Sequence, residues 1–310
     1  MNFATGAGPQ AVVVADLTGD GKADIATANL NGVSISVLVG NGLGGFAPGP
    51  TLVVPAGPVA IAVGDLNTDG KADIAVASFI SNSVYVLLGA GGGGFNSATT
   101  FAVGSGPQSI AIGDVDGNGK PDIATANWTS NNASVLLGNG LGGFGAATSY
   151  AVGTNPYSIA IGDLNGDGKP DLVTANYASH TLSLVFGNGV GGFAPSTSFI
   201  VGYFPFSVAI GDLNGDGKAD LAVANRGSST ISLLIGDGAG AFPTAPSYSA
   251  GSGSLFAAVG DLNADGRPDV ATANFAGSTL SILLGNGAGA SARRLRSRSA
   301  STHSASRWAT

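Results

Sequence analysis

The sequence predicts an all-β protein built from six copies of one 49-residue unit, each with four short strands. An aspartate-rich loop recurs at that constant spacing, beginning at Asp16, Asp65, Asp114, Asp163, Asp212 and Asp261. Runs of Val, Ile, Thr and Ala bounded by Gly, Asn and Pro are typical of strands, and no window has helical periodicity long enough for a helix. Four antiparallel strands in a repeat of this length are typical of a β-propeller blade.

The elements of one repeat follow in order along residues 101–149. An aromatic or apolar residue opens the unit, and a Gly/Pro turn leads into the apolar run SIAIGD. The aspartate loop comes next, followed by the strand DIATAN, a short variable turn and the run SVLLG. The unit closes on GNGLGGF, whose Asn-Gly pair is a strong hairpin signal. We therefore expect four strands in each repeat.

Residues 1–290 are predicted to form the propeller, with six visible blades. Ser291 stands where the closing phenylalanine belongs, so the outer strand of the sixth blade is expected to be missing at the C-terminus. Residues 2–5 have the sequence of an outer strand, and pairing the two ends would close a six-bladed ring and cover two sheet edges. The alternative is a truncated seven-bladed ring.

Residues 291–310 hold five arginines and no acidic residue, and they match nothing earlier in the chain. We expect a disordered Arg/Ser-rich tail, with a shifted reading frame as an alternative origin. A basic tail that binds nucleic acid is the competing interpretation, but no nucleic-acid partner is expected.

Composition restricts the chemistry further. The chain has no cysteine, which excludes disulfides and thiolate sites. No apolar stretch is long enough to span a bilayer, and no signal peptide is visible. The protein is therefore either cytoplasmic or a mature or truncated form, and we expect the second because the chain begins within a repeat. We also expect a monomer.

The acidic residues are concentrated in the loops. The chain has 19 aspartates and no glutamate, and 18 of the aspartates lie in the segments 16–24, 65–73, 114–122, 163–171, 212–220 and 261–269. Three carboxylates within a few ångströms repel by about 1–4 kcal/mol per pair. Residues 1–290 carry a net charge of −12, which six divalent ions would balance. The loops therefore predict up to six cation sites rather than empty turns.

Each loop follows D-x-[DNT]-x-[DN]-G-x-x-D, and we number its residues 1 to 9. Calcium takes six to eight oxygen ligands, which positions 1, 3, 5 and 9 offer from side chains and position 7 from its carbonyl. A glycine at position 6 permits the turn around the ion. The absence of Glu at position 12 and the flanking strands exclude an EF-hand, and magnesium suits such loops less well.

The predicted ligands are Asp16, Thr18, Asp20, Lys22 and Asp24; Asp65, Asn67, Asp69, Lys71 and Asp73; Asp114, Asp116, Asn118, Lys120 and Asp122; Asp163, Asn165, Asp167, Lys169 and Asp171; Asp212, Asn214, Asp216, Lys218 and Asp220; and Asp261, Asn263, Asp265, Arg267 and Asp269. The position-7 side chain is expected to point outward. Because Thr18 is a weaker ligand than Asn, the first site is expected to be the weakest.

The pattern DLNGDGKAD followed by GNGxGGF resembles the FG-GAP or VCBS repeat of integrin α-subunit propellers and many secreted bacterial proteins. The resemblance covers residues 2–290. It implies calcium in the loop between the first and second strands of each blade. It also implies an extracellular or periplasmic setting and a role in adhesion or ligand binding, while lectins and polysaccharide lyases use similar calcium propellers.

Variable turns at the other end of the strands predict a ligand patch. Aromatic and polar residues gather there in the third to fifth repeats, and the candidates are Trp128, Tyr157, Tyr177, His180, Tyr203, Phe204 and Arg226. Such residues suit sugar or protein recognition, and packing between blades is the alternative. We expect packing for Phe206, because Val59 and Leu255 occupy the matching positions.

We expect a calcium-binding, non-catalytic module for adhesion or ligand binding, with a carbohydrate-binding lectin as the alternative. Catalysis has little support, because Asp237 is the one aspartate outside the loops and glycoside hydrolysis usually needs two free carboxylates. A calcium-dependent polysaccharide lyase, with His180, Tyr177 or a lysine as base, is the best enzymatic alternative. No catalytic residue is assigned.

Overall fold

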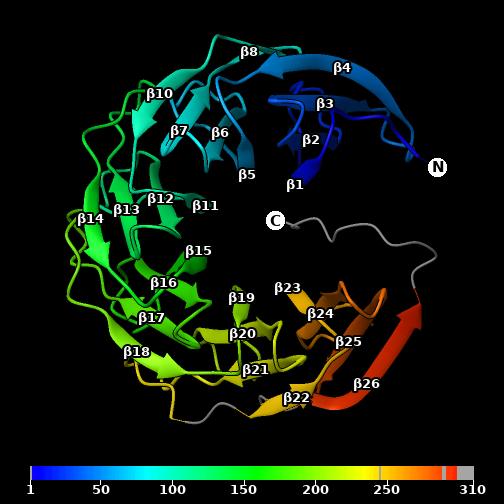
Figure 1. Ribbon diagram of the computed structural model, residues 1–310, viewed down its shortest axis with the longest axis vertical. Helices are drawn as coiled ribbons and strands as arrows, with labels where there is room; N and C mark the ends of the chain where they lie inside the picture. The colour runs from blue at the N-terminus through cyan, green and yellow to red at the C-terminus, as the bar shows by residue number, and fades with distance from the viewer. Residues whose placement is uncertain (1, 244–245, 288–290, 299–310) are drawn as a thin grey trace. The chain divides into compact units, whose positions relative to one another are not determined.

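The computed structural model describes residues 2–243, 246–287 and 291–298, and these contain strands and turns but no helix. The chain divides into two compact units, one up to Ser149 and one from Tyr150 onward, which are described separately. Each sheet has four strands in sequence order, as predicted. Within each unit, successive sheets lie side by side (Figure 1).

The first unit contains three sheets. Their strands are β1 (Pro9–Ala15), β2 (Asp24–Asn29), β3 (Ser34–Gly40) and β4 (Phe46–Val53); β5 (Pro58–Gly64), β6 (Asp73–Ser78), β7 (Ser83–Leu87) and β10 (Thr99–Ala102); and β11 (Pro107–Gly113), β12 (Asp122–Asn127), β13 (Asn132–Leu136) and β14 (Thr148–Ala151). A small hairpin pairs β8 (Gly89–Gly91) with β9 (Gly94–Phe95). Strand β14 ends in the second unit.

The second unit also contains three sheets. Their strands are β15 (Pro156–Gly162), β16 (Asp171–Asn176), β17 (Thr181–Val185) and β18 (Thr197–Ile200); β19 (Pro205–Gly211), β20 (Asp220–Asn225), β21 (Thr230–Leu234) and β22 (Ser247–Ser249); and β23 (Ser254–Gly260), β24 (Asp269–Asn274), β25 (Thr279–Gly285) and β26 (Ser291–Arg298). The strands of these sheets pair in antiparallel fashion, with Ile159 opposite Thr174 as one example.

The core lies between neighbouring sheets. The second strands β12, β16 and β20 are buried along their whole length, so both faces of each are covered. Each of these strands combines small Ala residues with larger Leu, Ile or Val residues, which allows sheets to approach closely while filling the space between them. First strands of neighbouring sheets contact each other, β1 with β5 and β5 with β11 in the first unit, and β15 with β19 and β19 with β23 in the second.

Aromatic pairs join one sheet to the next. The ring of Phe101 on β10 meets the ring of Phe144 edge-on at 5.2 Å, and Tyr150 meets Phe193 at 5.1 Å in the same way. In four repeats the closing phenylalanine therefore packs on the opening aromatic residue 43 positions earlier. This edge-to-face geometry is favourable for aromatic rings, and it explains why both residues recur in register.

Phe3 shows that the N-terminal segment follows the same rule without forming a strand. Its ring contacts Phe46 edge-on at 5.3 Å, yet residues 2–5 have no strand assignment. The expectation that this segment supplies the outer strand of the sixth sheet is wrong. That place is taken by β26, which pairs with β25 from Thr279 to Gly285.

Two predictions about the C-terminus are therefore corrected. The outer strand of the sixth sheet is present, and residues 291–298 are part of it rather than of a disordered tail. The physical reason is that the outer edge of β25 offers unpaired N–H and C=O groups, which an extended segment can satisfy without matching the repeat pattern. The remainder of the predicted tail, 299–310, lies outside the described residues.

A buried asparagine links the second and third strands of most sheets. In the fourth sheet, the Asn176 amide group donates to Thr181 and Ser183, and its Oδ1 accepts a hydrogen bond from Thr174. In the fifth sheet Val223 replaces the threonine, and the buried Oδ1 of Asn225 has no hydrogen-bond partner among the described residues. One sheet thus carries a polar defect that its neighbour does not.

Val223→Thr is expected to stabilise the protein by about 1 kcal/mol, because the new hydroxyl supplies the missing donor to Asn225 Oδ1. Urea unfolding of the variant and the wild type measures the change. Val76→Thr, at the equivalent position of the second sheet, is the matched control. Ser78 replaces the asparagine in that sheet, so the new threonine hydroxyl finds no amide oxygen to donate to. Equal effects of both substitutions would contradict this account of the defect.

Candidate metal centre and the aromatic patch

The aspartate loops occupy one end of every sheet. Each joins the first strand to the second, as between β11 and β12. Their position 1 follows the first strand directly and their position 9 begins the second strand. This placement agrees with the loop position that the sequence pattern implied.

The position-1 aspartate accepts hydrogen bonds from the loop backbone. Asp16 accepts N–H groups from Gly19, Asp20 and Gly21 at 2.7 to 3.1 Å. Bonds from the N–H groups of positions 5 and 6 recur in all six loops, as for Asp163 with Asp167 and Gly168. The Gly21 N–H is the main cause that lowers the pKa of Asp16 below 3.8. The first loop therefore favours the ionised form of Asp16.

Two positions in each loop have a left-handed backbone. Position 6 is always glycine, as expected, with φ of 81° at Gly217. Position 4 is also left-handed, which the sequence reasoning missed, with φ of 78° at Gly215, 57° at Thr68 and 60° at Ala264. Residues with a Cβ pay about 1–2 kcal/mol in this region. Thr68 recovers part of that cost by donating its hydroxyl to Gly140 O at 3.1 Å.

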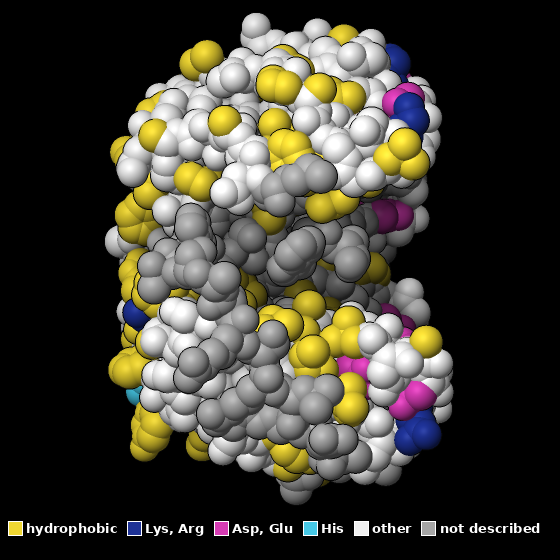
Figure 2. All heavy atoms as spheres, turned by 90° about the vertical axis from the view of Figure 1, so that its right-hand side faces the viewer, with side chains coloured by type: hydrophobic (Ala, Val, Ile, Leu, Met, Phe, Trp, Pro, Cys, Tyr) yellow, Lys and Arg dark blue, Asp and Glu magenta, His cyan; other side chains and the backbone are white. Residues whose placement is uncertain are grey.

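Position 5 faces position 7. Its side-chain oxygen accepts the position-7 N–H in every loop, and in four loops its carboxylate also pairs with the position-7 lysine. Lys22 Nζ lies 2.7 Å from Asp20 Oδ2, and this contact lowers the pKa of Asp20. Figure 2 shows acidic and basic side-chain atoms side by side on this surface. We expected the position-7 side chains to point outward. The lysines of these four loops instead fold back toward the position-5 carboxylate.

Position 9 is the buried member of the loop. The six carboxylates at this position (Asp24, Asp73, Asp122, Asp171, Asp220 and Asp269) are 0% exposed. Asp122 accepts the N–H of Val115 within its loop and the N–H of Gly138 at the end of β13. The same two bonds recur in all six sheets. Position 9 therefore ties the loop to the third strand.

Only glycine fits at the position whose N–H donates to this carboxylate. A Cβ on Gly138 would lie 2.1 Å from the backbone oxygen of Pro121, at position 8 of the loop. The equivalent glycines of the other sheets meet the same obstacle, as at Gly187 and Gly285. The recurrent final glycine of the SVLLG run was a visible signal of this contact.

Burial raises the pKa of Asp73, Asp122, Asp171 and Asp220, although the backbone N–H groups that they accept work in the opposite direction. Asp116 and Asp114 also raise the pKa of Asp122. Carboxylates in this situation gain from a nearby cation, because the cation offsets both the burial and the mutual repulsion.

The third loop provides the clearest test of whether the residues fit a metal ion. Oxygens of Asp114, Asp116 and Asp122 lie within 4.8 Å of one another. Two ligands of one calcium ion, at 2.3–2.6 Å each, can be about that far apart. Positions 1, 3 and 9 of this loop therefore fit calcium. In the other loops position 3 is Asn or Thr, so positions 1, 3 and 9 offer two carboxylates and a neutral oxygen.

Loops of neighbouring sheets are close to one another. Gly92 N, in the turn of the second sheet, donates to Thr18 O of the first loop at 3.0 Å. In the second unit a pocket of about 580 Å³ is lined by Asp163, Asp212, Lys218 and neighbouring residues of the fourth and fifth sheets. The loops thus also form part of the contact between sheets.

The structure brings together five of the residues of the predicted aromatic patch. Tyr177 and Phe204 stack with ring centroids 4.7 Å apart, and His180 meets Phe204 and Tyr203 edge-on at 4.8 and 5.1 Å. Arg226 Nη1 donates to Tyr177 Oη at 3.3 Å. We call these five residues the Arg226 cluster. They come from the turns after β16, β18 and β20.

Other predicted patch residues have different surroundings. Tyr157 packs against Phe206 at 3.7 Å, and Phe206 is 8% exposed and meets Phe256, so the expectation of packing for Phe206 is confirmed. Trp128 belongs to the first unit, where its N–H donates to Gly106 O. The structure therefore groups five of the seven candidates.

The side chain of His180, the residue considered as the base of a lyase, forms a hydrogen bond with the backbone. Its Nδ1 accepts the Phe204 N–H at 3.1 Å. Asn82 and Ser229 occupy the equivalent position in other repeats and accept the equivalent N–H groups of Gly106 and Gly253. His180 therefore occupies a position whose side chain accepts the same backbone hydrogen bond in other repeats.

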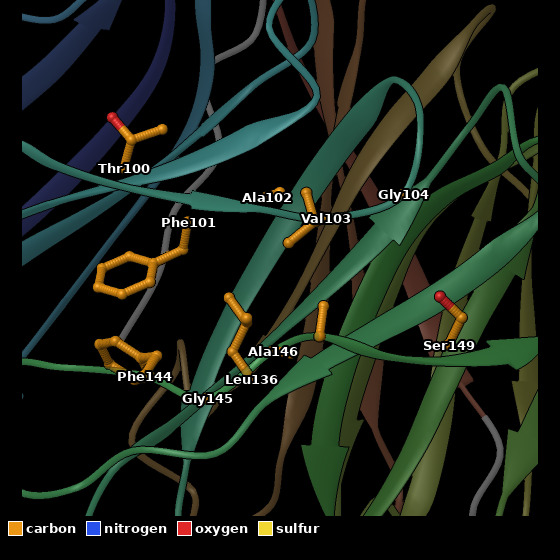
Figure 3. Close-up of a pocket in the computed structure, with 11 residues that line it drawn as sticks. Thr100, Phe101, Ala102, Val103, Gly104, Leu136, Phe144, Gly145, Ala146 and Ser149 are labelled. Atoms are coloured by element: carbon orange, nitrogen blue, oxygen red, sulfur yellow. The ribbon is translucent and has the colours of Figure 1, made fainter.

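A further pocket of about 500 Å³ lies in the first unit, between β10 and the segment before β14. Phe101 and Phe144 line one side of it, with Leu136, Ala146 and Ser149 across from them (Figure 3). Its lining contains no titratable side chain, so it offers no acid, base or metal ligand.

Repeated four-stranded antiparallel sheets with aspartate loops between first and second strands define a β-propeller. The family model described as FG-GAP-like repeat matches residues 16–76, 65–125, 114–174, 163–223 and 212–272. The chain therefore belongs to the FG-GAP repeat family, as the resemblance predicted. No curated protein matches the sequence.

Solved structures with the same fold have varied functions. A lectin from Agrocybe aegerita that recognises non-reducing terminal N-acetylglucosamine is 21% identical, with a TM-score of 0.64, over 94% of this chain and 80% of that chain. Virginiamycin B lyase from Staphylococcus aureus is 14% identical, with a TM-score of 0.64, over 94% and 85%. A candidate 6-phosphogluconolactonase from Bacteroides uniformis is 13% identical, with a TM-score of 0.68, over 89% and 80%.

These similarities correct the prediction that the chain is not an enzyme. The fold is shared with a lyase and a candidate lactonase, so the propeller gives no ground for excluding catalysis, and at these identities it does not demonstrate catalysis either. The described residues contain no helix long and apolar enough to cross a membrane.

Ala264→Gly is expected to raise the free energy of unfolding by about 1 kcal/mol, because it relieves a left-handed alanine at position 4 of the sixth loop. Gly215→Ala, at the same position of the fifth loop, is expected to lower it by about 1–2 kcal/mol. No atom lies within 4 Å of a Cβ built on Gly215, so the effect is conformational rather than steric. Chemical unfolding measures both, and effects of the same sign would contradict this reading.

Proposed function

We propose that this chain is a calcium-stabilised binding module of an extracellular or periplasmic protein. The observation that carries the proposal is the geometry of the third loop, in which carboxylate oxygens of positions 1, 3 and 9 lie within 4.8 Å of one another and position 9 is buried. Family membership supports the same reading. The predicted ligands of the six loops remain the proposed calcium ligands, with position 7 contributing its carbonyl.

The chemical role proposed for calcium is to neutralise charge at each loop. The chain itself already performs part of that work, because backbone N–H groups and the position-7 lysines meet positions 1, 5 and 9. A bound cation supplies the charge that these contacts leave unbalanced. Because position 9 also holds the third strand, calcium binding at the loop is coupled to the stability of the whole sheet.

The binding activity itself is proposed to lie at the opposite ends of the strands. The Arg226 cluster combines stacked aromatic rings with an exposed guanidinium, which suits recognition of a glycan or a protein. Glycan binding is the candidate that a specific observation favours, since a similar structure is a lectin. Adhesion to a protein partner is the second candidate.

Calcium is expected to raise the melting temperature of the chain in a cooperative transition. Each site that binds only the folded state adds about 2.7 kcal/mol when calcium is a hundredfold above its Kd. The measurement is a thermal melt of the full chain in EGTA and in millimolar calcium, with magnesium as the comparison ion. A melt that calcium does not move would contradict the proposal.

Asp116→Asn is the matching loop variant, because it removes one of the three clustered carboxylates of the third loop. It is expected to reduce the calcium-dependent shift. Asp237→Asn is the charge-matched control, since Asp237 lies outside the loops and accepts N–H groups from Ala239 and Ala241. Asparagine occupies the equivalent position in four other repeats. An equal loss in both variants would argue against specific loop sites.

A further inference from the structure

The Arg226 cluster contains features that the repeat does not require. We propose that it binds a carboxylate-bearing sugar residue, as in a polysaccharide that contains uronic acid. This inference rests on the proposed ligand-binding function and specifies its ligand class. Tyr177, His180, Tyr203, Phe204 and Arg226 all lie in the second unit, on turns that leave the sheets away from the aspartate loops.

Arg226 gives the site its charge preference. It is the one basic residue of positions 1–290 outside the aspartate loops. Among the described residues it forms no ion pair, and Nη1 is engaged only by Tyr177 Oη at 3.3 Å. A guanidinium has five N–H donors, so the exposed group retains donors for a carboxylate, which it can bind in bidentate geometry.

The acidic loops do not cancel this charge. The second strand, six residues long in each sheet, separates loop from turn, which corresponds to about 20 Å. That distance exceeds the Debye length of about 8 Å at physiological ionic strength. An anion at Arg226 is therefore shielded from the net negative charge of the loops.

The aromatic side chains give the site a flat apolar face beside the cation. The Tyr177 and Phe204 rings stack with an interplanar angle of 23°, and Tyr203 is 64% exposed and Phe204 39% exposed. A sugar ring has an apolar face and polar edges, so it can lie on aromatic rings while its carboxylate meets Arg226. The pairing of one aromatic surface with one guanidinium matches a uronic acid residue in both respects.

Phe204 is the clearest departure from the repeat. It adopts φ of 52°, while Gly106, Asn155 and Gly253 hold the equivalent left-handed position in other repeats. Bulky residues rarely adopt this conformation. The nearby turn is altered to match, because a Cβ on Gly227 would lie 2.3 Å from the Phe204 ring.

Other repeats have the opposite arrangement. A Cβ on Gly106 would lie 2.5 Å from the Thr129 hydroxyl, so glycine occupies the left-handed position there and a larger residue occupies the turn. The fifth sheet thus exchanges the large and small residues, which brings an aromatic ring to the surface. A strained residue with a compensating glycine indicates selection for something other than stability.

Backbone contacts hold the cluster in place. The Arg226 N–H donates to Phe204 O at 3.0 Å, and the Phe204 N–H donates to His180 Nδ1 at 3.1 Å. His180 Nδ1 also lies 3.1 Å from the Tyr177 carbonyl oxygen, so the imidazole is held between the two turns. Preorganisation of this kind lowers the entropy cost of binding a ligand.

The size of the cluster favours a saccharide over a protein partner. A specific protein interface takes about 20–30 residues on each side. Five residues on three turns are enough for one or two sugar units. An acidic peptide shares the carboxylate but not the flat apolar ring, so it serves as the contrasting probe.

The test is titration of the full chain, in calcium-containing buffer, with a tetrasaccharide of alternating glucuronate and N-acetylglucosamine, followed by calorimetry or NMR. The same tetrasaccharide with its carboxyls reduced to alcohols, and a tetra-aspartate peptide, are the comparison probes. The acidic saccharide is expected to bind about tenfold or more tightly than either comparison. Equal binding of the reduced sugar, equal binding of the peptide, or no binding would overturn the proposal.

Two variants locate the site. Arg226→Gln and Phe204→Gly are each expected to weaken binding about tenfold or more, and Phe204→Gly is expected to keep or raise the melting temperature because glycine suits its left-handed position. Phe275→Ala is the matched control, since Phe275 occupies the position of Arg226 in the next repeat and is 49% exposed. Binding that both cluster variants retain would overturn the assignment.

The outcome is separable from that of the calcium proposal. A chain that calcium stabilises but that does not bind the acidic saccharide would refute this inference alone. A chain that binds the saccharide through Arg226 but is not stabilised by calcium would support the inference and refute the calcium role.

Discussion

The buried carboxylate at position 9 is the contact on which each sheet depends. Asp122 joins its own loop through the Val115 N–H and the third strand through the Gly138 N–H, and its equivalents do the same in every sheet. Asp122 is the first residue of the second strand, so its side chain connects that strand to the loop that follows the first strand and to the end of the third strand. Its burial raises its pKa, and a cation at the loop favours the ionised form that makes these bonds. The proposed calcium ion would therefore act on the same carboxylate that holds the strands together.

Constant positions of the repeat serve the fold, and the departures indicate function. The paired aromatic residues, the buried asparagines and the glycine after the third strand recur because neighbouring strands and sheets require them. Phe204, Gly227 and Arg226 have no such requirement, and they occur together in one sheet. Residues that depart from the repeat pattern are therefore better candidates for ligand binding than residues that recur in every repeat.

The 49-residue period and the apolar runs predicted the strands and the loops. They also predicted that the aspartate loops lie at one end of the strands and the variable turns at the other. The sequence also predicted that Phe206 would be packed. The strand β26 could not be predicted, because Ser291–Arg298 lacks the repeat pattern and pairs through its backbone with an exposed edge. The left-handed position 4 was hidden, since Thr68 and Ala264 obscure the preference for glycine. The backbone role of His180 was hidden as well, because it depends on Phe204 from the next sheet.

The central claim is that the loops are calcium sites, and direct stoichiometry tests it. Purified chain is dialysed to equilibrium against calcium at millimolar concentration, and bound metal is counted per chain by elemental analysis, with EGTA-treated protein as the reference. We expect up to six calcium ions per chain, and we expect the first loop, which carries Thr18, to lose its ion most readily. A chain that holds no calcium above the reference, while folded, would contradict the central claim.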